Sequence, residues 1–297
     1  MKNKKASLRV RLPRRADNRI DGGAVSAFIV KHLFIYALGF TTLVPFAWML
    51  SSSLKWDRDV FATPIQWIPD PPRWENYVKV FQEIPFATYY LNSLKIAICV
   101  LALQLLTCSM AAFSFTKLHY RGRSFLLLVY IATLMVPSQV TMIPQFMIVR
   151  NLGLFNTHTA LILLSGFSAF GIFMLVQFFR SIPEELMEAA KIDGANLFTI
   201  YWRIMLPLAK PALAALAIMS FIGEFNSFMQ PMIYLNSEHL RTVTIGLRSF
   251  VTEYASAINL QMAGTVLTLV PVILIYIFAQ EQIIQGISFN GGAGVKG

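Results

Sequence analysis

The sequence predicts an all-α protein that crosses a membrane six times. Hydrophobic residues make up 56% of the chain and charged residues only 13%, about half the charge that a soluble domain carries. The mean hydropathy of the chain is +0.58. Six segments are also long and apolar enough to form the roughly 20-residue helix that spans a bilayer: 28–54, 91–115, 124–149, 157–179, 211–235 and 262–285.

A basic arm, residues 1–27, precedes the first span, 28–54. This span is longer than the core of a cleavable signal peptide, so we expect it to be retained. The net charge of +10 comes largely from the arm and from short loops. Such a distribution favours membrane orientation over nucleic-acid binding, and it places the N-terminus in the cytoplasm. Six spans then place the C-terminal tail, residues 286–297, on the same side, with a permease domain over 28–285.

The middle spans contain several prolines, among them Pro137 and Pro144. A membrane tolerates kinks at such positions because neighbouring groups pair with the freed carbonyls. The first outer loop, about 55–90, is rich in Trp and Pro. It is predicted to be a compact segment at the interface, either an aromatic anchor or a docking surface for an extracytoplasmic partner. The second outer loop, about 236–261, is expected to contain a short helix.

The inner loop between the fourth and fifth spans, residues 180–211, has the pattern of a helix-turn-helix. Ser181 and Glu184 form a capping-box pattern that predicts a helix over about 182–192. Gly194 provides the chain reversal, because glycine adopts left-handed dihedral angles without steric cost. A second short helix is expected to end at Leu206-Pro207, and Pro211 opens the fifth span.

The first of these short helices is predicted to be amphipathic. One face combines Ile182, Leu186, Ala189 and Ala190, and the other combines Glu184, Glu188 and Lys191. The helix is poorly suited to lie on lipid, because its alanines insert little bulk and its first-turn acids are repelled by an anionic leaflet. We interpret it as a docking element for a soluble partner.

In this loop the chain resembles the integral-membrane subunits of ATP-binding-cassette (ABC) importers. The resemblance rests on Glu188-Ala189-Ala190, then Gly194, then Ile204 with Leu206-Pro207, in that family's order and spacing. Further stretches resemble the carbohydrate-uptake, MalG-like branch: Ser53-Leu54-Lys55 with Trp67-Ile68-Pro69 and Glu75-Asn76-Tyr77, Phe225-Asn226-Ser227-Phe228 with Pro231, and the ending Gly294-Val295-Lys296-Gly297. The tail departs from the family's small-residue run at Phe289-Asn290-Gly291.

The resemblance implies a type I importer permease in a bacterial inner membrane, with a coupling helix around 183–194 that sits in a groove of an ATPase subunit. Its expected partners are a second homologous permease, an ABC ATPase dimer, an extracytoplasmic solute-binding protein, membrane lipid and a sugar substrate. ATP and Mg would bind to the ATPase, and this chain would bind no cofactor. The implied ATPase-coupling residues are Glu184, Glu188, Ala189, Ala190, Asp193, Gly194, Leu206 and Pro207.

Polar and aromatic residues within the predicted spans are candidates for the substrate path. A charged residue at the bilayer centre costs roughly 2.5–3.5 kcal/mol on insertion scales, so Glu224 is expected to face protein or water. The candidates are Gln139, Glu224, Phe225, Asn226, Phe228 and Gln230. For each of them, a role in helix packing is an equally good interpretation.

An intramembrane protease and an ion-coupled secondary transporter are the two alternative function classes. Gly166-Phe167-Ser168-Ala169 is a weak match to an intramembrane serine protease, but the single histidine after Ser168, His239, falls in an outer loop. An ion-coupled secondary transporter usually has several buried acids and an internal repeat. The sequence contains no phosphate-binding loop and no cluster with metal-ligand spacing. A non-enzymatic permease, powered by a partner subunit, is therefore the favoured prediction.

Overall fold

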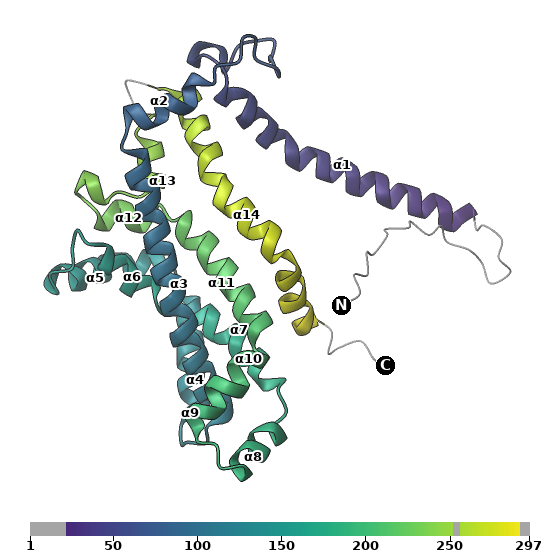
Figure 1. Ribbon diagram of the computed structural model, residues 1–297, viewed down its shortest axis with the longest axis vertical. Coiled ribbons are helices and arrows are strands. Elements are labelled where there is room, and N and C mark those ends of the chain that lie inside the picture. Colours follow the sequence, from purple (N-terminus) through teal and green to yellow (C-terminus); the bar gives the residue numbers. More distant parts are fainter. Residues whose placement is uncertain (1–21, 252–255, 292–297) are drawn as a thin grey trace.

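The computed structural model describes residues 22–251 and 256–291. These residues form helices joined by short loops (Figure 1). Most of the basic arm and the last residues of the tail, 292–297, lie outside the described residues. Within the described part, extended pairing is limited to one isolated bridge between Val251 and Ser256. The predicted all-α class is confirmed.

Four stretches are continuous candidates for membrane spans. They lie in α1 (Gly22–Ser53), in α3 (Phe86–Lys117), in α6 (His158–Ser165) with α7 (Ala169–Arg180), and in α14 (Ile258–Gly291). Two further candidates are helix pairs with a sharp bend. The described residues therefore contain six spans if each bent pair is counted as one, in agreement with the predicted number.

The third predicted span, 124–149, is not one straight helix. It consists of α4 (Arg123–Ala132), a 3-10 turn (Thr133–Met135) and α5 (Ser138–Asn151), and its two halves meet at 104°. Val136 is extended at the break, as a residue before proline prefers to be. Pro137 lacks the N–H that would continue the helix. The bend thus follows from the Val136-Pro137 pair.

The fifth predicted span, 211–235, ends earlier than expected. The helix α11 (Lys210–Phe225) stops at Phe225, and α12 (Met229–Tyr234) is a separate short helix. The side chain of Asn226 donates from Nδ2 to the Ile222 carbonyl oxygen at 2.9 Å. Asparagine commonly ends helices by such local bonds, because they compete with the backbone ladder. On its other side, α11 meets the segment Leu197–Leu208 at 75°.

The helix α3 lies at the centre of the bundle, packed against α7 and α11 (Figure 1). The helix α14 packs against α11, α1 and α2 (Glu75–Glu83). The apolar window of α1 buries none of its residues, and in Figure 1 this helix extends away from the bundle. Nearly all of the first span therefore presents apolar side chains to its surroundings.

The two outer loops pack together at one end of the bundle. Asn76 on α2 donates from Nδ2 to the carbonyl oxygens of Ser53 and Lys55, at 2.9 and 2.8 Å. Asn259 donates to the same Lys55 carbonyl at 3.2 Å. The second outer loop contains a 3-10 turn (Glu238–Leu240) and the helix α13 (Val243–Arg248), which confirms the predicted short helix. The two loops that are predicted to be outer thus pack together at one end of the bundle.

Candidate functional site

The predicted coupling loop forms the end of the bundle opposite the outer loops (Figure 1). It contains α8 (Glu185–Ile192), α9 (Leu197–Ile200), a π-helical turn (Tyr201–Met205) and α10 (Leu206–Leu208). The helix-turn-helix pattern is present, but α8 begins later than the expected residue 182. Ser181 does not cap it, because the Ser181 hydroxyl donates to the Phe178 carbonyl oxygen at 2.7 Å.

The buried face of α8 differs from the predicted one. Met187 and Ala190 are buried, at 4% and 8% exposure, in a cluster with Ile200 and Met205. Leu186 and Ala189, which were expected to share their face with Ala190, are exposed. Ala190 therefore packs inside this chain, where its small side chain lets α8 approach the second short helix. The part that Ala190 plays in ATPase coupling stays a prediction.

The outward face of α8 carries most of the remaining coupling candidates. Glu184, Glu188, Ala189, Asp193 and Gly194 are all exposed. Ile192, which lies among them, is 86% exposed, although it is a large apolar residue. Its sequence neighbours are Lys191 and Asp193, so this exposed apolar side chain lies among charged ones. The loop therefore presents a mixed acidic and apolar face, away from its own core.

Gly194 occupies the turn after α8 with φ +80°. A Cβ atom built at this position meets no heavy atom within 4 Å. The requirement for glycine therefore comes from the backbone conformation and not from crowding. Asn196 then caps α9, since its Oδ1 accepts a hydrogen bond from the Thr199 backbone N–H at 2.8 Å. The turn predicted at Gly194 is present.

A hydrogen bond links the second half of the loop to the central helix. The hydroxyl groups of Tyr201 and Ser109 on α3 lie 2.7 Å apart. The second short helix was expected to be continuous, and its π-helical turn was not predicted. The coupling candidates Leu206 and Pro207 follow this turn, and they are half-buried and exposed, respectively. Movement of the loop would therefore reach α3 directly.

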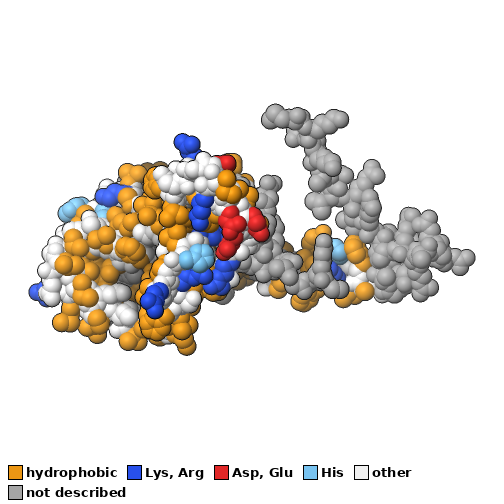
Figure 2. Space-filling model, turned by 90° about the horizontal axis from the view of Figure 1, so that it is seen from below, with side chains coloured by type: hydrophobic (Ala, Val, Ile, Leu, Met, Phe, Trp, Pro, Cys, Tyr) orange, Lys and Arg blue, Asp and Glu red, His pale blue; other side chains and the backbone are white. Residues whose placement is uncertain are grey.

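A second link joins the start of the loop to α3. Lys117, the last residue of α3, is 5% exposed and donates from Nζ to the Ile182 carbonyl oxygen at 2.6 Å. Figure 2 views this end of the molecule and shows acidic, basic and histidine side chains grouped together. A small cavity there is lined by Lys117, His119, Glu184, Met187, Glu188 and Lys191. The loop is thus connected to α3 at both ends.

Among the substrate-path candidates, Glu224 and Gln230 lie together. Both line a narrow cavity of about 10 Å³ with Ser93, Ser227 and Thr242, among others. Ser165, at the end of α6, donates to Gln230 Oε1 at 3.1 Å. The structure therefore brings an acid, an amide and several hydroxyl groups together between α3, α6, α11 and α12.

The other path candidates do not join this polar cluster. Phe225 is 1% exposed and stacks on Phe221 with ring centroids 5.5 Å apart, so it is a packing residue and not a free sugar platform. Asn226 bonds to its own helix. The centroid of the Phe228 ring lies 5.4 Å from the guanidinium carbon of Arg248. Gln139 is exposed on α5 and does not line the cavity of Glu224.

Comparison with known protein families shows the family to which the chain belongs. Residues 104–288 match the family of binding-protein-dependent transport system inner membrane components. The chain belongs to this family. It is a multi-pass inner-membrane permease of an ABC importer, as the coupling-loop resemblance predicted. The family consists of transport components, which excludes the intramembrane protease alternative and gives no support to an ion-coupled transporter.

Several relatives are similar over most of their length. The arabinooligosaccharides transport system permease AraQ of Halalkalibacterium halodurans is 33% identical over 88% of this chain and 93% of its own. The diacetylchitobiose uptake system permease NgcG of Streptomyces coelicolor is 32% identical over 87% of each chain. The lactose permease component LacG of Rhizobium radiobacter is 31% identical over 87% of this chain and 94% of its own.

Solved structures agree with this assignment. A chain of a bacterial ABC transporter that imports the acidic polysaccharide alginate superimposes with a TM-score of 0.78 and 25% identity, covering 88% of this chain and 98% of the other. A second alginate transporter structure, in complex with a periplasmic protein bound to an alginate pentasaccharide, gives a TM-score of 0.56 at 14% identity, covering 85% and 94%. This second match supports the fold alone.

Proposed function

We propose that this permease imports a sugar or sugar-like solute, and that its loop 180–211 couples the transport to ATP hydrolysis in a separate subunit. The substrate class is supported by the relatives, whose names refer to arabinooligosaccharides, diacetylchitobiose and lactose. The coupling role is supported by one observation above all: α8 turns Met187 and Ala190 inward and leaves Glu188, Ala189 and Ile192 outward.

The partner at this loop is an ABC ATPase dimer, with ATP and Mg bound to the ATPase. The described residues include no glycine-rich phosphate loop, so this chain needs another subunit to supply the energy. The hydrogen bonds of Lys117 to Ile182 and of Tyr201 to Ser109 supply the mechanical connection. When the ATPase moves α8, these bonds transmit the movement to α3, which packs against both α7 and α11.

A second, homologous permease covers α1. The apolar window of this helix buries none of its residues in the chain alone, and large side chains such as Phe40 and Tyr36 are exposed. Lipid would tolerate such a surface, but membrane helices commonly pack through it onto other helices. Because Figure 1 shows α1 extended away from the bundle, the geometry suits a partner of similar height beside α14.

A solute-binding protein docks at the outer end, with both termini of the permease in the cytoplasm. The first outer loop exposes Ile68 at 86% and Trp74 at 66%. The guanidinium carbon of Arg73 lies 3.3 Å from the centroid of the Trp56 ring, which orders this surface. The alginate transporter that crystallised with its periplasmic protein is a similar assembly.

The decisive experiment compares two neighbouring alanines. In a background with Cys99 and Cys108 replaced by serine, single cysteines are introduced as Ala189→Cys and Ala190→Cys. Crosslinking in membranes that contain the whole importer should join the ATPase to position 189 and not to position 190. ATP-dependent uptake of candidate oligosaccharides into proteoliposomes tests the substrate class. Equal crosslinking at both positions, or none at 189, contradicts the coupling role.

A further inference from the structure

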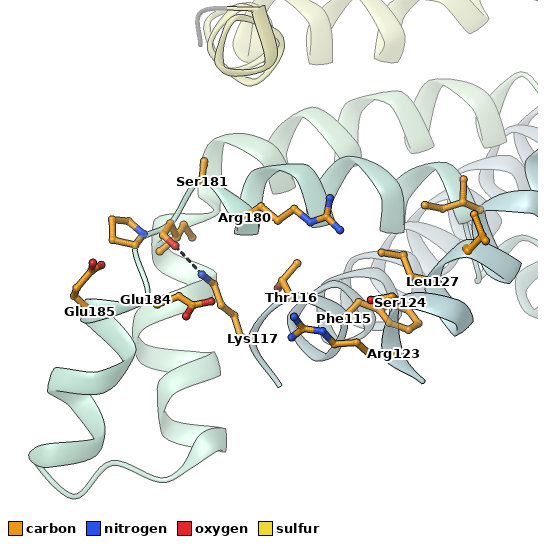
Figure 3. Close-up of a pocket in the computed structure, with 14 residues that line it drawn as sticks. Phe115, Thr116, Lys117, Arg123, Ser124, Leu127, Arg180, Ser181, Glu184 and Glu185 are labelled. Atoms are coloured by element: carbon orange, nitrogen blue, oxygen red, sulfur yellow. Dashed lines mark hydrogen bonds between the residues drawn. The ribbon is translucent and has the colours of Figure 1, made fainter. Parts of the chain in front are cut away.

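A cavity of about 710 Å³ lies beside the start of the coupling loop. It is open on one side and is bounded by the end of α3, the first turns of α4, and the segment that joins α7 to α8 (Figure 3). Three of its lining residues are basic: Lys117, Arg123 and Arg180. They come from three different helices, so the fold and not a local charge run brings them together.

The basic groups of this cavity retain unused donors. Arg123 donates from Nη1 to the Leu118 carbonyl oxygen at 2.9 Å, and Lys117 from Nζ to the Ile182 carbonyl oxygen at 2.6 Å. In the described part of the chain, neither Arg123 nor Arg180 forms an ion pair with a carboxylate. In Figure 3 both guanidinium groups point toward the same space. Guanidinium groups arranged in this way bind phosphate well.

The acidic residues of the lining lie at the other side of the cavity. Figure 3 shows Glu184 and Glu185 beyond Lys117, away from Arg123 and Arg180. The buried Lys117 ammonium lies between the acids and the arginines and weakens the repulsion that they exert on an anion. Hydroxyl groups of Thr116, Ser124 and Ser181 complete the polar part of the lining. A negative group is therefore accommodated best between the two arginines.

The lining is apolar along α4. The first two turns of α4 after Arg123 line the cavity with Leu127, Leu128 and Ile131. Leu128 is 65% exposed. Since α3 ends at Lys117, α4 begins at Arg123 and α7 ends at Arg180, the polar part lies at the level where the spans leave the bilayer. The site thus combines a basic end at headgroup level with an apolar face directed into the membrane.

We propose that this cavity binds the phosphate headgroup of an anionic phospholipid, with an acyl chain lying along Leu128 and Ile131. Basic pockets between membrane helices on the cytoplasmic side are known to take such headgroups. A free phosphate ion would use the arginines but not the apolar face. The cavity is also lined by Ile182, Pro183 and Glu184, so the bound lipid would steady the segment that leads into α8.

The test uses the complete importer, purified in mild detergent at its native size, and phospholipid extraction with mass spectrometry. The double variant Arg123→Gln/Arg180→Gln is compared with Arg121→Gln/Arg150→Gln, which removes the same charge from exposed residues outside the cavity and outside the coupling loop. We expect a several-fold loss of retained phosphatidylglycerol or cardiolipin in the first variant and wild-type retention in the second. Equal retention in the two variants overturns the proposal.

Two further measurements separate the possible ligands and guard against misfolding. Phospholipid retention that persists in millimolar inorganic phosphate supports a lipid, whereas a cavity that binds inorganic phosphate and retains no phospholipid overturns the proposal in favour of a free anion. In the wild-type complex, a photoreactive phosphatidylglycerol should label peptides within 123–131 or 180–185. Labelling that avoids both segments overturns the site even if the double variant fails to assemble. Because these readouts do not involve transport, their failure would leave the proposed sugar import untouched.

Discussion

Gln104 on α3 donates a hydrogen bond from Nε2 to the backbone carbonyl oxygen of Ser165 at 2.5 Å, at the point where the fourth span stops being helical. Thr107 donates to the Gly166 carbonyl oxygen at 2.9 Å, and Cys108 to that of Ser168 at 3.5 Å. An interrupted helix leaves carbonyls without partners, and hydrocarbon supplies none. Side chains on α3 therefore satisfy the carbonyl oxygens that the interruption between α6 and α7 leaves free, which allows the break to lie inside a bilayer.

Gln104→Leu should destabilise the permease by about 1–3 kcal/mol, because it leaves a buried carbonyl unpaired. Ser220 would also lose a partner, since its hydroxyl donates to Gln104 Oε1. The free energy of unfolding in mixed micelles measures this effect. Cys99→Ala, at an exposed position of the same helix, is the matched control and should change little. An unfolding curve that Gln104→Leu leaves unchanged would contradict the role of this bond.

Gly194→Val should weaken coupling to the ATPase while the chain still inserts. The φ of +80° costs a residue with a Cβ atom about 1–2 kcal/mol, and asparagine tolerates it better than valine. Gly194→Asn is therefore the control, and it should retain most activity. The measurements are ATPase co-purification and the number of solutes imported per ATP hydrolysed. If both variants transport normally, the turn is not required for coupling.

Lys55 should make folding stability depend on pH in the alkaline range. The amine is buried, its Nζ has no hydrogen-bond partner among the described residues, and burial lowers its pKa, partly opposed by Asp59. Between the folded and unfolded pKa values, the unfolded chain binds more protons. Stability should therefore rise as pH increases through the window below the ordinary lysine pKa.

The Lys55 effect is checked by thermal unfolding at neutral and alkaline pH. Lys55→Met should raise the midpoint at neutral pH and remove most of the alkaline increase. Lys79→Met, on α2 and only half-buried, is the control and should leave the increase in place. A wild-type midpoint that falls continuously as the pH is raised from neutral would show that the sign is wrong.

Glu224→Ala should change the rate or range of import while ATPase docking stays intact. Glu224 lines the narrow cavity that Gln230 shares, so its removal alters the polar cluster and not the distant loop. Glu224→Gln keeps a hydrogen-bonding group of nearly the same shape and should retain more activity. Uptake in proteoliposomes and ATPase co-purification distinguish the outcomes. Loss of membrane insertion in both variants would indicate a structural role.

The sequence was sufficient for features that depend on local patterns. Apolar length located the six spans, and glycine chemistry located the turn at Gly194. The 104° bend after Met135 was not predicted as a break, because the apolar pattern of 124–149 continues through it. Proline at position 137 was the available signal, but proline also occurs within intact helices here, as Pro45 does in α1.

The orientation of α8 could not be read from its own residues. Leu186 with Ala189, and Met187 with Ala190, are two neighbouring stripes of similar apolarity. The choice between them is made by packing against Ile200 and Met205, which only the folded chain brings near. Phe225 illustrates the same limit, since its contacts with Phe221 and Tyr90 bury its ring within this chain, and Tyr90 is far from it in the sequence.

Ala189 and Ala190 are identical in chemistry and adjacent in sequence, yet they obey different constraints. Ala190 is enclosed by this polypeptide, so a larger residue there must be accommodated by a change elsewhere in the same gene, for example at Met205. Ala189 lies outside that core, so in the proposed complex an enlargement there calls for a compensating change in the ATPase. Suppressor selections begun at the two positions should consequently lead to different genes.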